Sequence, residues 1–291
     1  MSSVFDRLAL AGLGGTVIVP FILAATHDIP TTAAKDCARS PDVLPAEALI
    51  TLQRDGIVVL PVPLPTTLIT QARSRARDLV AHMSQDLGTS QEVRRDFTTW
   101  IRLSDNQTGD VSLESCAALL RGLAFELDKS PAFTRSHTHR SPLDLQLACF
   151  DGGGAFYRAH RDAPTLGTSS SLLYLGLQGW LAARPYRRRC ITAILYLNDQ
   201  DWCCDPDTDG GALRVYLGAE TDDEVGTTAA QVLSICPSSG TLVLFDSQQI
   251  LHEVCPSNRQ RIALTCWIAG EYTGVGLGQE PPKSGPTTPR P

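Results

Sequence analysis

The chain has 291 residues, of which 43% are hydrophobic and 19% charged, and its formal net charge is −6. This length allows one large domain or two modest ones, with ample material for a buried core. The composition excludes a chain that is mainly disordered, and the negative charge argues against nucleic acid as a partner, because binding through net charge requires a basic surface.

Residues 8–26 form an apolar segment without a charged side chain, long enough to cross a bilayer as a helix. Asp6 cancels Arg7 before the segment, whereas Lys35 and Arg39 follow it, which would leave the rest of the chain on the cytoplasmic side. Two interpretations of residues 8–26 are equally open: a segment for membrane anchoring or targeting, and a buried N-terminal element. We expect residues 1–44 to be an apolar segment and a linker, and the protein to be cytoplasmic.

The next part of the chain has apolar residues at helical spacing. This pattern predicts helices over 45–56, 66–85 and 112–130, the last one capped by Ser112, and a short strand over 57–60.

From residue 145 the sequence pattern predicts short strands, separated by Gly, Pro, Asp and Asn turns. This pattern favours an all-β sandwich or barrel. The strands are expected over 145–150, 189–197, 212–217, 230–236, 241–245 and 261–269. We therefore predict a mainly β fold with flanking helices, in which the N-terminal helices buttress the β half. Residues 273–291 are rich in Pro and Gly and are predicted to be a disordered tail.

Nine cysteines are spread over the whole chain, and no CxxC motif occurs. This favours reduced, structural cysteines in a reducing compartment over a disulfide scaffold. Adjacent Cys203 and Cys204, in an Asp-rich loop, are the pair that we expect to be most open to oxidation.

The candidate metal ligands begin with the motif AHRDAP, which contains His160 and Asp162. On an extended backbone these two side chains point to the same face. The spacing alone is weak evidence, but His252, after the apolar run 241–245, supplies a second imidazole. Two histidines and one carboxylate form the facial triad of non-haem Fe(II) oxygenases, although zinc enzymes use similar ligands.

Arg261 begins the last predicted strand, on which alternation places it on one face with Ala263, Thr265 and Trp267. A guanidinium is always charged and engages a carboxylate bidentately, so an arginine inside a barrel suits a bound dicarboxylate. The alternative is an edge-strand arginine that points to water.

These motifs resemble the 2-oxoglutarate- and Fe(II)-dependent dioxygenases, specifically the prolyl 4-hydroxylase group and, within it, the hypoxia-inducible-factor prolyl hydroxylases. The resemblance spans residues 45–272. It rests on the stretches RDGIVVL (54–60), RRDFTTWI (94–101), ACFDGGGAFYRAHRDAP (148–164), RCITAILYLN (189–198), GGALRVY (210–216), GTLVLFDS (240–247) and HEVCPSNRQRIALTCW (252–267).

The resemblance implies a double-stranded β-helix (jelly-roll) domain over residues 45–272 and assigns a role to each matching position. His160, Asp162 and His252 would bind Fe(2+), and Arg261 and Tyr196 would hold the distal carboxylate of 2-oxoglutarate. The pocket lining would be Ile194, Leu213, Thr265 and Trp267, and a mobile substrate loop would be positioned by Arg94 and Asp96.

The implied activity is hydroxylation of a peptidyl proline, with O2 and 2-oxoglutarate as co-substrates, succinate and CO2 as further products, and L-ascorbate keeping the iron ferrous. The partner would be a proline-containing protein, and a weak oxygen affinity would make the enzyme an oxygen sensor in the response to hypoxia. Rival interpretations are a dioxygenase of the same fold that acts on another residue or a small molecule, and a non-catalytic β-barrel binding module. The oligomeric state stays open.

Two departures from the family pattern concern the substrate. Phe150 stands where the most similar relatives have a tyrosine near the co-substrate, and an insert over 163–188 replaces a short connection. Because the insert leaves from beside the metal ligands, we expect it to form a lid or a docking element.

Overall fold

The structure is a computed structural model that describes residues 43–80, 91–101, 110–135, 145–163, 189–219 and 231–272. These ranges hold the helices α1 (Ala46–Asp55), α2 (Thr66–Val80) and α3 (Val111–Leu127). Their strands are β1 (Ile57–Pro61), β2 (Phe97–Ile101), β3 (Phe133–Arg135), β4 (Leu145–Asp151), β5 (Ala155–His160), β6 (Arg189–Tyr196), β7 (Leu213–Leu217), β8 (Gln231–Ile235), β9 (Thr241–Asp246), β10 (Leu251–Ser257) and β11 (Gln260–Tyr272).

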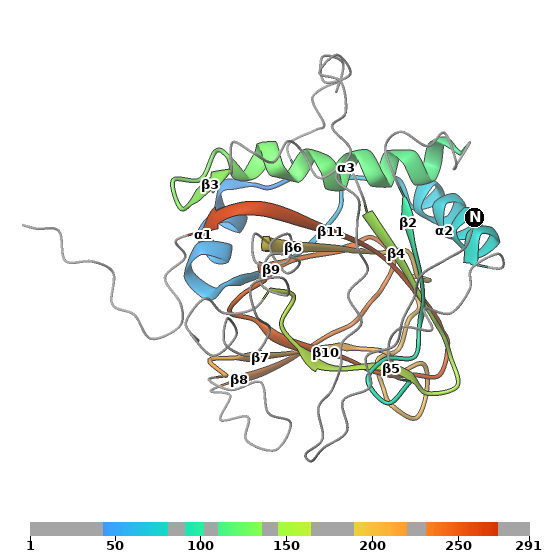
Figure 1. Cartoon of the computed structure of the whole chain (residues 1–291). Coiled ribbons are helices and arrows are strands. Elements are labelled where there is room, and N and C mark those ends of the chain that lie inside the picture. The colour runs from blue at the N-terminus through green and yellow to red at the C-terminus, as the bar shows by residue number, and fades with distance from the viewer. Residues whose placement is uncertain are drawn as a thin grey trace, which may run out of the picture.

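The strands form two antiparallel sheets. The larger sheet has the order β1-β9-β6-β11-β4-β2, with β3 also paired to β11, and the smaller sheet has the order β5-β10-β7-β8. Figure 1 shows the larger sheet between the long helix α3 and the smaller sheet. This arrangement confirms the predicted double-stranded β-helix with helices packed on one side.

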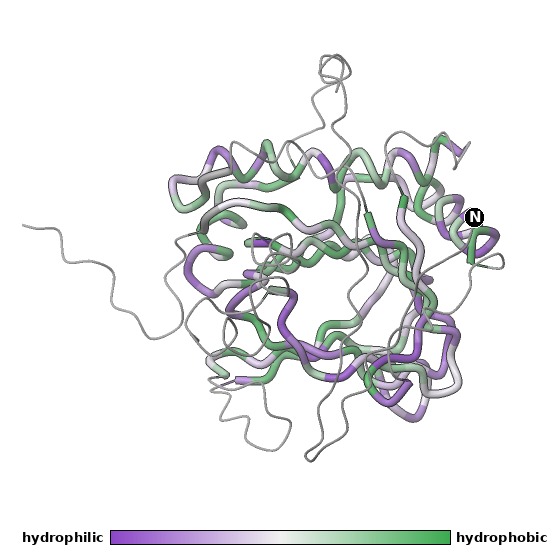
Figure 2. The backbone as a smooth tube through the Cα atoms, viewed as in Figure 1, coloured by the Kyte–Doolittle hydropathy of each residue, from purple (hydrophilic) through white to green (hydrophobic). Residues whose placement is uncertain are grey.

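The two faces of the larger sheet have different neighbours. On β11, the residues Ile262, Leu264, Cys266 and Ile268 belong to the core cluster that also contains the buried residues of the helices. Ala263 instead belongs to a second cluster inside the barrel, with Ile194 and Tyr196 of β6. Green, hydrophobic segments predominate along the strands beneath α3 in Figure 2. The alternation predicted for residues 261–268 is therefore confirmed.

Local signals explain the end of α1 and the start of α3. Helix α1 stops at Gly56, whose φ of 73° lets its N–H return to the carbonyl of Leu52. The prediction of Ser112 as the cap of α3 is wrong, because the carboxylate of Asp110 accepts from the N–H groups of Ser112 and Leu113. Ser112 belongs to the first turn of the helix, and the cap lies two residues before it.

Some predicted features fall outside the described residues. These are residues 1–42, including the apolar segment 8–26, the end of the second helix, nearly all of the insert and the tail 273–291. Among the described helices, none has the length and apolar character needed to span a membrane. The cytoplasmic location stays a prediction.

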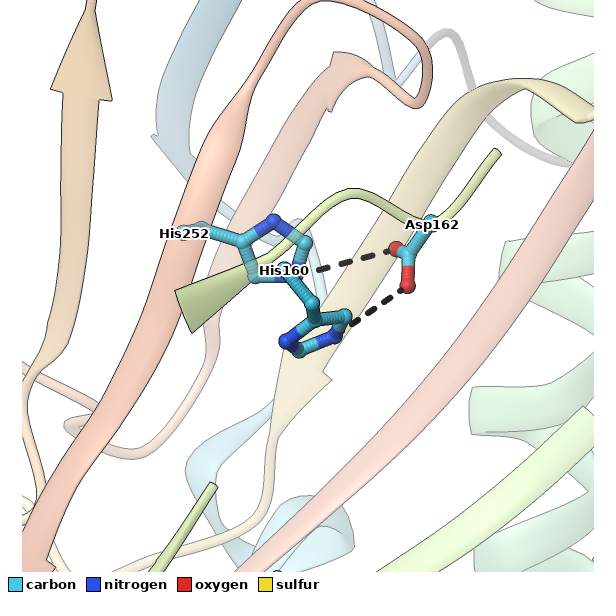
Figure 3. A group of neighbouring side chains, drawn as sticks. All are labelled: His160, Asp162 and His252. Atoms are coloured by element: carbon cyan, nitrogen blue, oxygen red, sulfur yellow. Dashed lines mark ion pairs between the residues drawn. The ribbon is translucent and has the colours of Figure 1, made fainter. Parts of the chain in front are cut away.

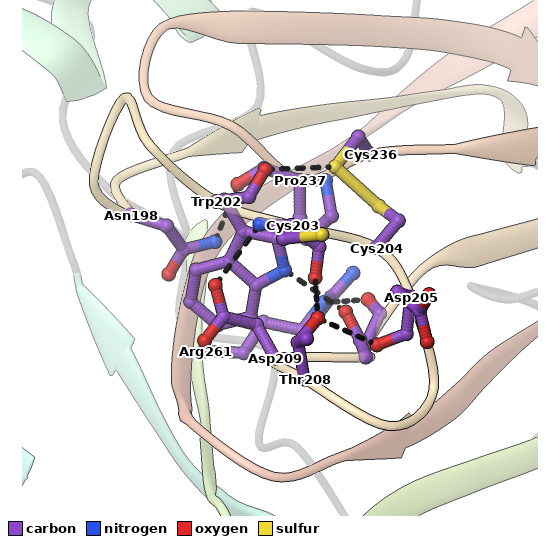
Figure 4. The surroundings of a disulfide bond; sticks show 12 residues. Asn198, Trp202, Cys203, Cys204, Asp205, Thr208, Asp209, Cys236, Pro237 and Arg261 are labelled. Carbon is purple, nitrogen blue, oxygen red and sulfur yellow. Dashed lines mark hydrogen bonds between the residues drawn. A yellow bond between two sulfur atoms is a disulfide. The ribbon is translucent and has the colours of Figure 1, made fainter.

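One expectation about the cysteines is wrong. Cys204 forms a disulfide with Cys236, which lies 32 residues further along the chain, rather than with its neighbour Cys203 (Figure 4). The Cα atoms of Cys204 and Cys236 are 5.5 Å apart, within the range that a disulfide spans, whereas adjacent Cα atoms are only about 3.8 Å apart. The bond joins the β6–β7 loop to the end of β8, so the cysteines are not all reduced as expected.

Candidate metal and co-substrate site

The three candidate metal ligands meet at one end of the smaller sheet. His160 ends β5 and is the register partner of His252 in β10, so strand pairing brings two histidines from distant parts of the chain face to face. Asp162 follows β5 by two residues. Figure 3 shows its carboxylate directed toward both imidazole rings.

The distances between the ligand atoms suit one metal ion. His160 Nε2 lies 3.6 Å from Asp162 Oδ1, and His252 Nε2 lies 3.9 Å from Asp162 Oδ2. One atom from each residue can be chosen so that all three lie within 4.8 Å of one another. An ion with ligand bonds of ~2.0–2.2 Å fits this spacing. The donor set, two imidazoles and one carboxylate, is the set that non-haem Fe(II) uses.

Hydrogen bonds set the tautomer of both histidines. His160 Nδ1 lies 2.8 Å from the carbonyl oxygen of Arg158, and His252 Nδ1 lies 3.2 Å from that of Ile250. A carbonyl only accepts, so each Nδ1 donates its proton and each Nε2 keeps a lone pair for a metal.

The protonation states also suit a cation. Burial, followed by the nearby His160, lowers the pKa of His252 to about 4, so its ring is neutral at pH 7. Burial alone would raise the pKa of Asp162, but His252, His160 and Arg189 outweigh it and hold that pKa far below its usual range. The group therefore offers the neutral imidazole of His252 and the carboxylate of Asp162 to a metal ion.

Arg261 forms the other polar end of the barrel interior. Its side chain is fully buried, its Nε donates to the carbonyl oxygen of Gly211 at 2.9 Å, and its Cζ lies 5.0 Å and 4.9 Å from the ring centroids of Phe150 and Tyr196. Within the described residues, no carboxylate forms an ion pair with this guanidinium. The nearby Tyr196 hydroxyl is buried and has no hydrogen-bond partner there either.

A buried cation and an unsatisfied buried hydroxyl are both costly without a partner. A carboxylate group of a small ligand would satisfy the two together, so the residues fit 2-oxoglutarate. Gly211 has a φ of 67°, and a Cβ there would lie 2.7 Å from Ser257 Oγ and 3.2 Å from Arg261 Cδ. Glycine is thus required where the backbone meets this arginine.

An apolar cluster connects the arginine end to the metal end. It contains Ile194, Tyr196, Leu213, Phe245 and Ala263. The rings of Phe245 and His252 are 4.6 Å apart, so the cluster reaches the metal ligands. The predicted lining residues Ile194 and Leu213 therefore lie between the two polar ends, and Thr265 is the register partner of Ile194.

Trp267 is linked to the metal end through Arg189. The guanidinium of Arg189 stacks on its ring at 3.9 Å and donates to the backbone oxygen of Asp162 at 3.3 Å. The partly exposed ring of Trp100 lies 5.7 Å from the Trp267 ring. The predicted pair Arg94 and Asp96 forms an ion pair beside this region.

Sequence reasoning missed several contributors to the site. Tyr157 stacks on the His160 ring at 3.8 Å and also carries the Arg94 guanidinium on its face, 4.5 Å from the centroid. Thr192 donates to Asp162 at 2.7 Å and contacts Ser247. The spacing does not reveal Tyr157, because residues three apart in a regular strand point to opposite faces, and the register of β5 with β10 shifts between Tyr157 and His160. Thr192 carries no local signal, because its partners are distant in sequence.

A sequence profile described as the 2OG-Fe(II) oxygenase superfamily matches residues 145–269. No curated protein matches the chain by sequence. Solved structures share the fold. A prolyl hydroxylase from Trichoplax adhaerens, in complex with a peptide fragment of the hypoxia inducible factor oxygen degradation domain, is 21% identical, with a TM-score of 0.55, over 76% of this chain and 87% of that one.

Two prolyl 4-hydroxylases have similar sequence identities and TM-scores to this chain. The one from Pseudomonas putida has 22% identity and a TM-score of 0.53 over 78% of this chain and 98% of its own. The one from Phytophthora capsici has 21% identity and a TM-score of 0.54 over 82% of this chain and 67% of its own. The matched segment contains the strands that carry both histidines and the buried arginine, which favours an enzyme over a non-catalytic module, and residues 145–269 are similar to the 2OG-Fe(II) oxygenase superfamily.

Proposed function

We propose that this protein hydroxylates proline residues of a protein or peptide, with Fe(II) held by His160, Asp162 and His252. The observation that carries the proposal is the pairing of this ligand group with a buried Arg261 and an unsatisfied Tyr196 hydroxyl at the opposite end of one apolar cluster. When bound, Fe(II) and 2-oxoglutarate supply the activation of O2, with succinate and CO2 formed as a substrate C–H bond is hydroxylated.

The residues of the chain bind the metal and the co-substrate and hold them in position. The Nδ1–H bonds of His160 and His252 hold both rings so that Nε2 faces the carboxylate of Asp162. The Nε of Arg261 donates to Gly211, and none of the described residues accepts from its terminal nitrogens, so these would bind the distal carboxylate of 2-oxoglutarate, with the Tyr196 hydroxyl as a further donor. The apolar side chains between these ends exclude water, which strengthens both interactions.

The surface beside the metal ligands supports a proline as the substrate residue. Tyr157 stacks on His160, Trp267 is linked to Asp162 through Arg189, and the partly exposed Trp100 lies beside Trp267. The pyrrolidine ring is compact and apolar and packs well on aromatic faces. The Trichoplax adhaerens relative was solved with a peptide bound, which is in keeping with a peptide substrate here.

The proposal is tested by mass spectrometry on a library of proline-containing peptides incubated with the full chain, Fe(II), 2-oxoglutarate, ascorbate and air. We expect oxygen to be incorporated on proline, with one succinate formed per hydroxylation. An Asp162→Ala variant and a reaction without 2-oxoglutarate serve as controls. Modification of another residue type, or turnover only with a small molecule, would contradict the assignment of proline. An oxygen-sensing role stays a prediction, which the dependence of the rate on O2 concentration tests.

A further inference from the structure

A buried hydroxyl holds one oxygen of the metal-binding carboxylate. Thr192 Oγ1 lies 2.7 Å from Asp162 Oδ2, whereas Asp162 Oδ1 lies 3.6 Å from His160 Nε2. A carboxylate that binds a metal carries no proton, so the Thr192 hydroxyl is the donor. The two oxygens of Asp162 therefore differ, because one already accepts a hydrogen bond from the protein.

A second hydroxyl fixes the direction of this hydrogen bond. Ser247 Oγ lies 2.8 Å from Thr192 Oγ1. Since Thr192 has one proton and gives it to Asp162, Ser247 must donate to Thr192. Both residues are completely buried, so bulk water does not compete for the bonds.

The backbone around the two hydroxyls is fixed by strands. Thr192 lies in β6, the strand between β9 and β11, with Phe245 and Trp267 as its register partners. Ser247 directly follows β9. Its carbonyl oxygen accepts from the N–H of Ala163 at 2.9 Å, so the residue after Asp162 is tied to the same place. The backbone that carries the Thr192 hydroxyl is therefore held in place beside the carboxylate.

We propose that Thr192, supported by Ser247, is a positioning residue that occupies Asp162 Oδ2, so that the carboxylate binds the metal through Oδ1 alone. A metal with two imidazoles and one carboxylate oxygen keeps three positions open, which 2-oxoglutarate and O2 need. A carboxylate bound through both oxygens would take one of them. The inference concerns the metal site and holds whichever substrate is hydroxylated.

The test uses Mn(II) as a redox-stable probe, titrated into the metal-free full chain by calorimetry. Three variants at one position separate the hydroxyl from packing: Thr192→Val keeps the shape without the hydroxyl, Thr192→Ser keeps the hydroxyl without the methyl group, and Thr192→Ala lacks both. Thr98→Val in β2 is the matched control, since Thr98 lies in the same sheet opposite Ala148.

We expect Thr192→Val and Thr192→Ala to weaken Mn(II) binding by about 10–100-fold, the usual effect of losing a hydrogen bond to a metal ligand. Thr192→Ser should stay within about threefold of the wild type, and Thr98→Val should not change. The affinity of the Mn(II)-loaded variants for 2-oxoglutarate should fall in the same order, which a merely structural role of Thr192 would not cause.

Two results would overturn the proposal. One is a loss smaller than about fivefold in Thr192→Val. The other is a Thr192→Ser variant as weak as Thr192→Ala, which would mean that the methyl group matters and the hydroxyl does not. If Thr192→Val fails to fold, as judged by circular dichroism, the comparison of Thr192→Ser with Thr192→Ala decides the question alone. Because the readout is metal binding, it does not depend on whether peptidyl proline is the substrate.

Discussion

The two faces of strand β11 contact different parts of the molecule. Its outward side chains, among them Leu264 and Cys266, pack in the core shared with the helices, while its inward side chains include Arg261, Thr265 and Trp267. The outer face stabilises the fold through apolar burial, and the inner face presents a buried charge and polar atoms that need a ligand. Alternate residues of one strand therefore serve stability and chemistry separately.

The largest expected effect concerns the metal end of the interior. Asp162→Ala should lower succinate formation by more than about 100-fold, because loss of a direct ligand exceeds the 10–100-fold typical of its supporting residues. The melting temperature of the metal-free protein should fall little in comparison. The assay is succinate release from 2-oxoglutarate with Fe(II), and activity that survives in this variant would exclude Asp162 as a ligand.

On the outer face, Leu264→Ala should destabilise the domain by about 2–5 kcal/mol, because it leaves a cavity at a fully buried position. The measurement is urea unfolding followed by circular dichroism. Activity per folded molecule should be unchanged. A change in KM for 2-oxoglutarate would show that the two faces of β11 are coupled.

At the arginine end, Arg261→Lys should raise KM for 2-oxoglutarate by about 10–100-fold and leave Mn(II) affinity within about twofold. An ammonium group cannot reproduce the planar fork that pairs with a carboxylate and donates to Gly211 at the same time. Steady-state kinetics over a range of 2-oxoglutarate concentrations measure this effect. An unchanged KM would remove Arg261 from the co-substrate site.

The smallest effect is an absence of reaction at Cys266 on the outer face of β11. Burial raises the pKa of its thiol to about 12, so the reactive thiolate is scarce at pH 8. Iodoacetamide should therefore leave Cys266 unmodified in the native protein and modify it in urea, while exposed Cys203 reacts in both. Peptide mapping by mass spectrometry reads this out. Native labelling of Cys266 would mean that the outer face opens.

The sequence predicted those features whose signals are local. Alternation over residues 261–268 separated the two faces of β11 correctly, and the HxD spacing identified His160 and Asp162. The features that were missed depend on distant partners. β2 (Phe97–Ile101) becomes a strand by pairing with β4, and Cys204 is bonded to Cys236, which lies 32 residues further along the chain. Neither partnership leaves a pattern in neighbouring residues.

The contacts of Thr192 with Asp162 and Ser247 show the same limit inside the site. These residues are 30 and 55 positions apart from Thr192. From the sequence, a threonine in an apolar strand is expected to be an ordinary β-branched strand residue. Only the antiparallel register of β6 with β9 and β11 reveals its role.

The central claim is that the metal end and the arginine end of the interior form one site for 2-oxoglutarate. It is tested most directly by anaerobic calorimetric titration of 2-oxoglutarate into the Mn(II)-loaded protein, the metal-free protein, and Mn(II)-loaded Arg261→Lys. We predict one binding site per chain, with affinity lost by about tenfold or more when either the metal or the Arg261 guanidinium is removed. Binding of equal strength in all three samples would contradict the account.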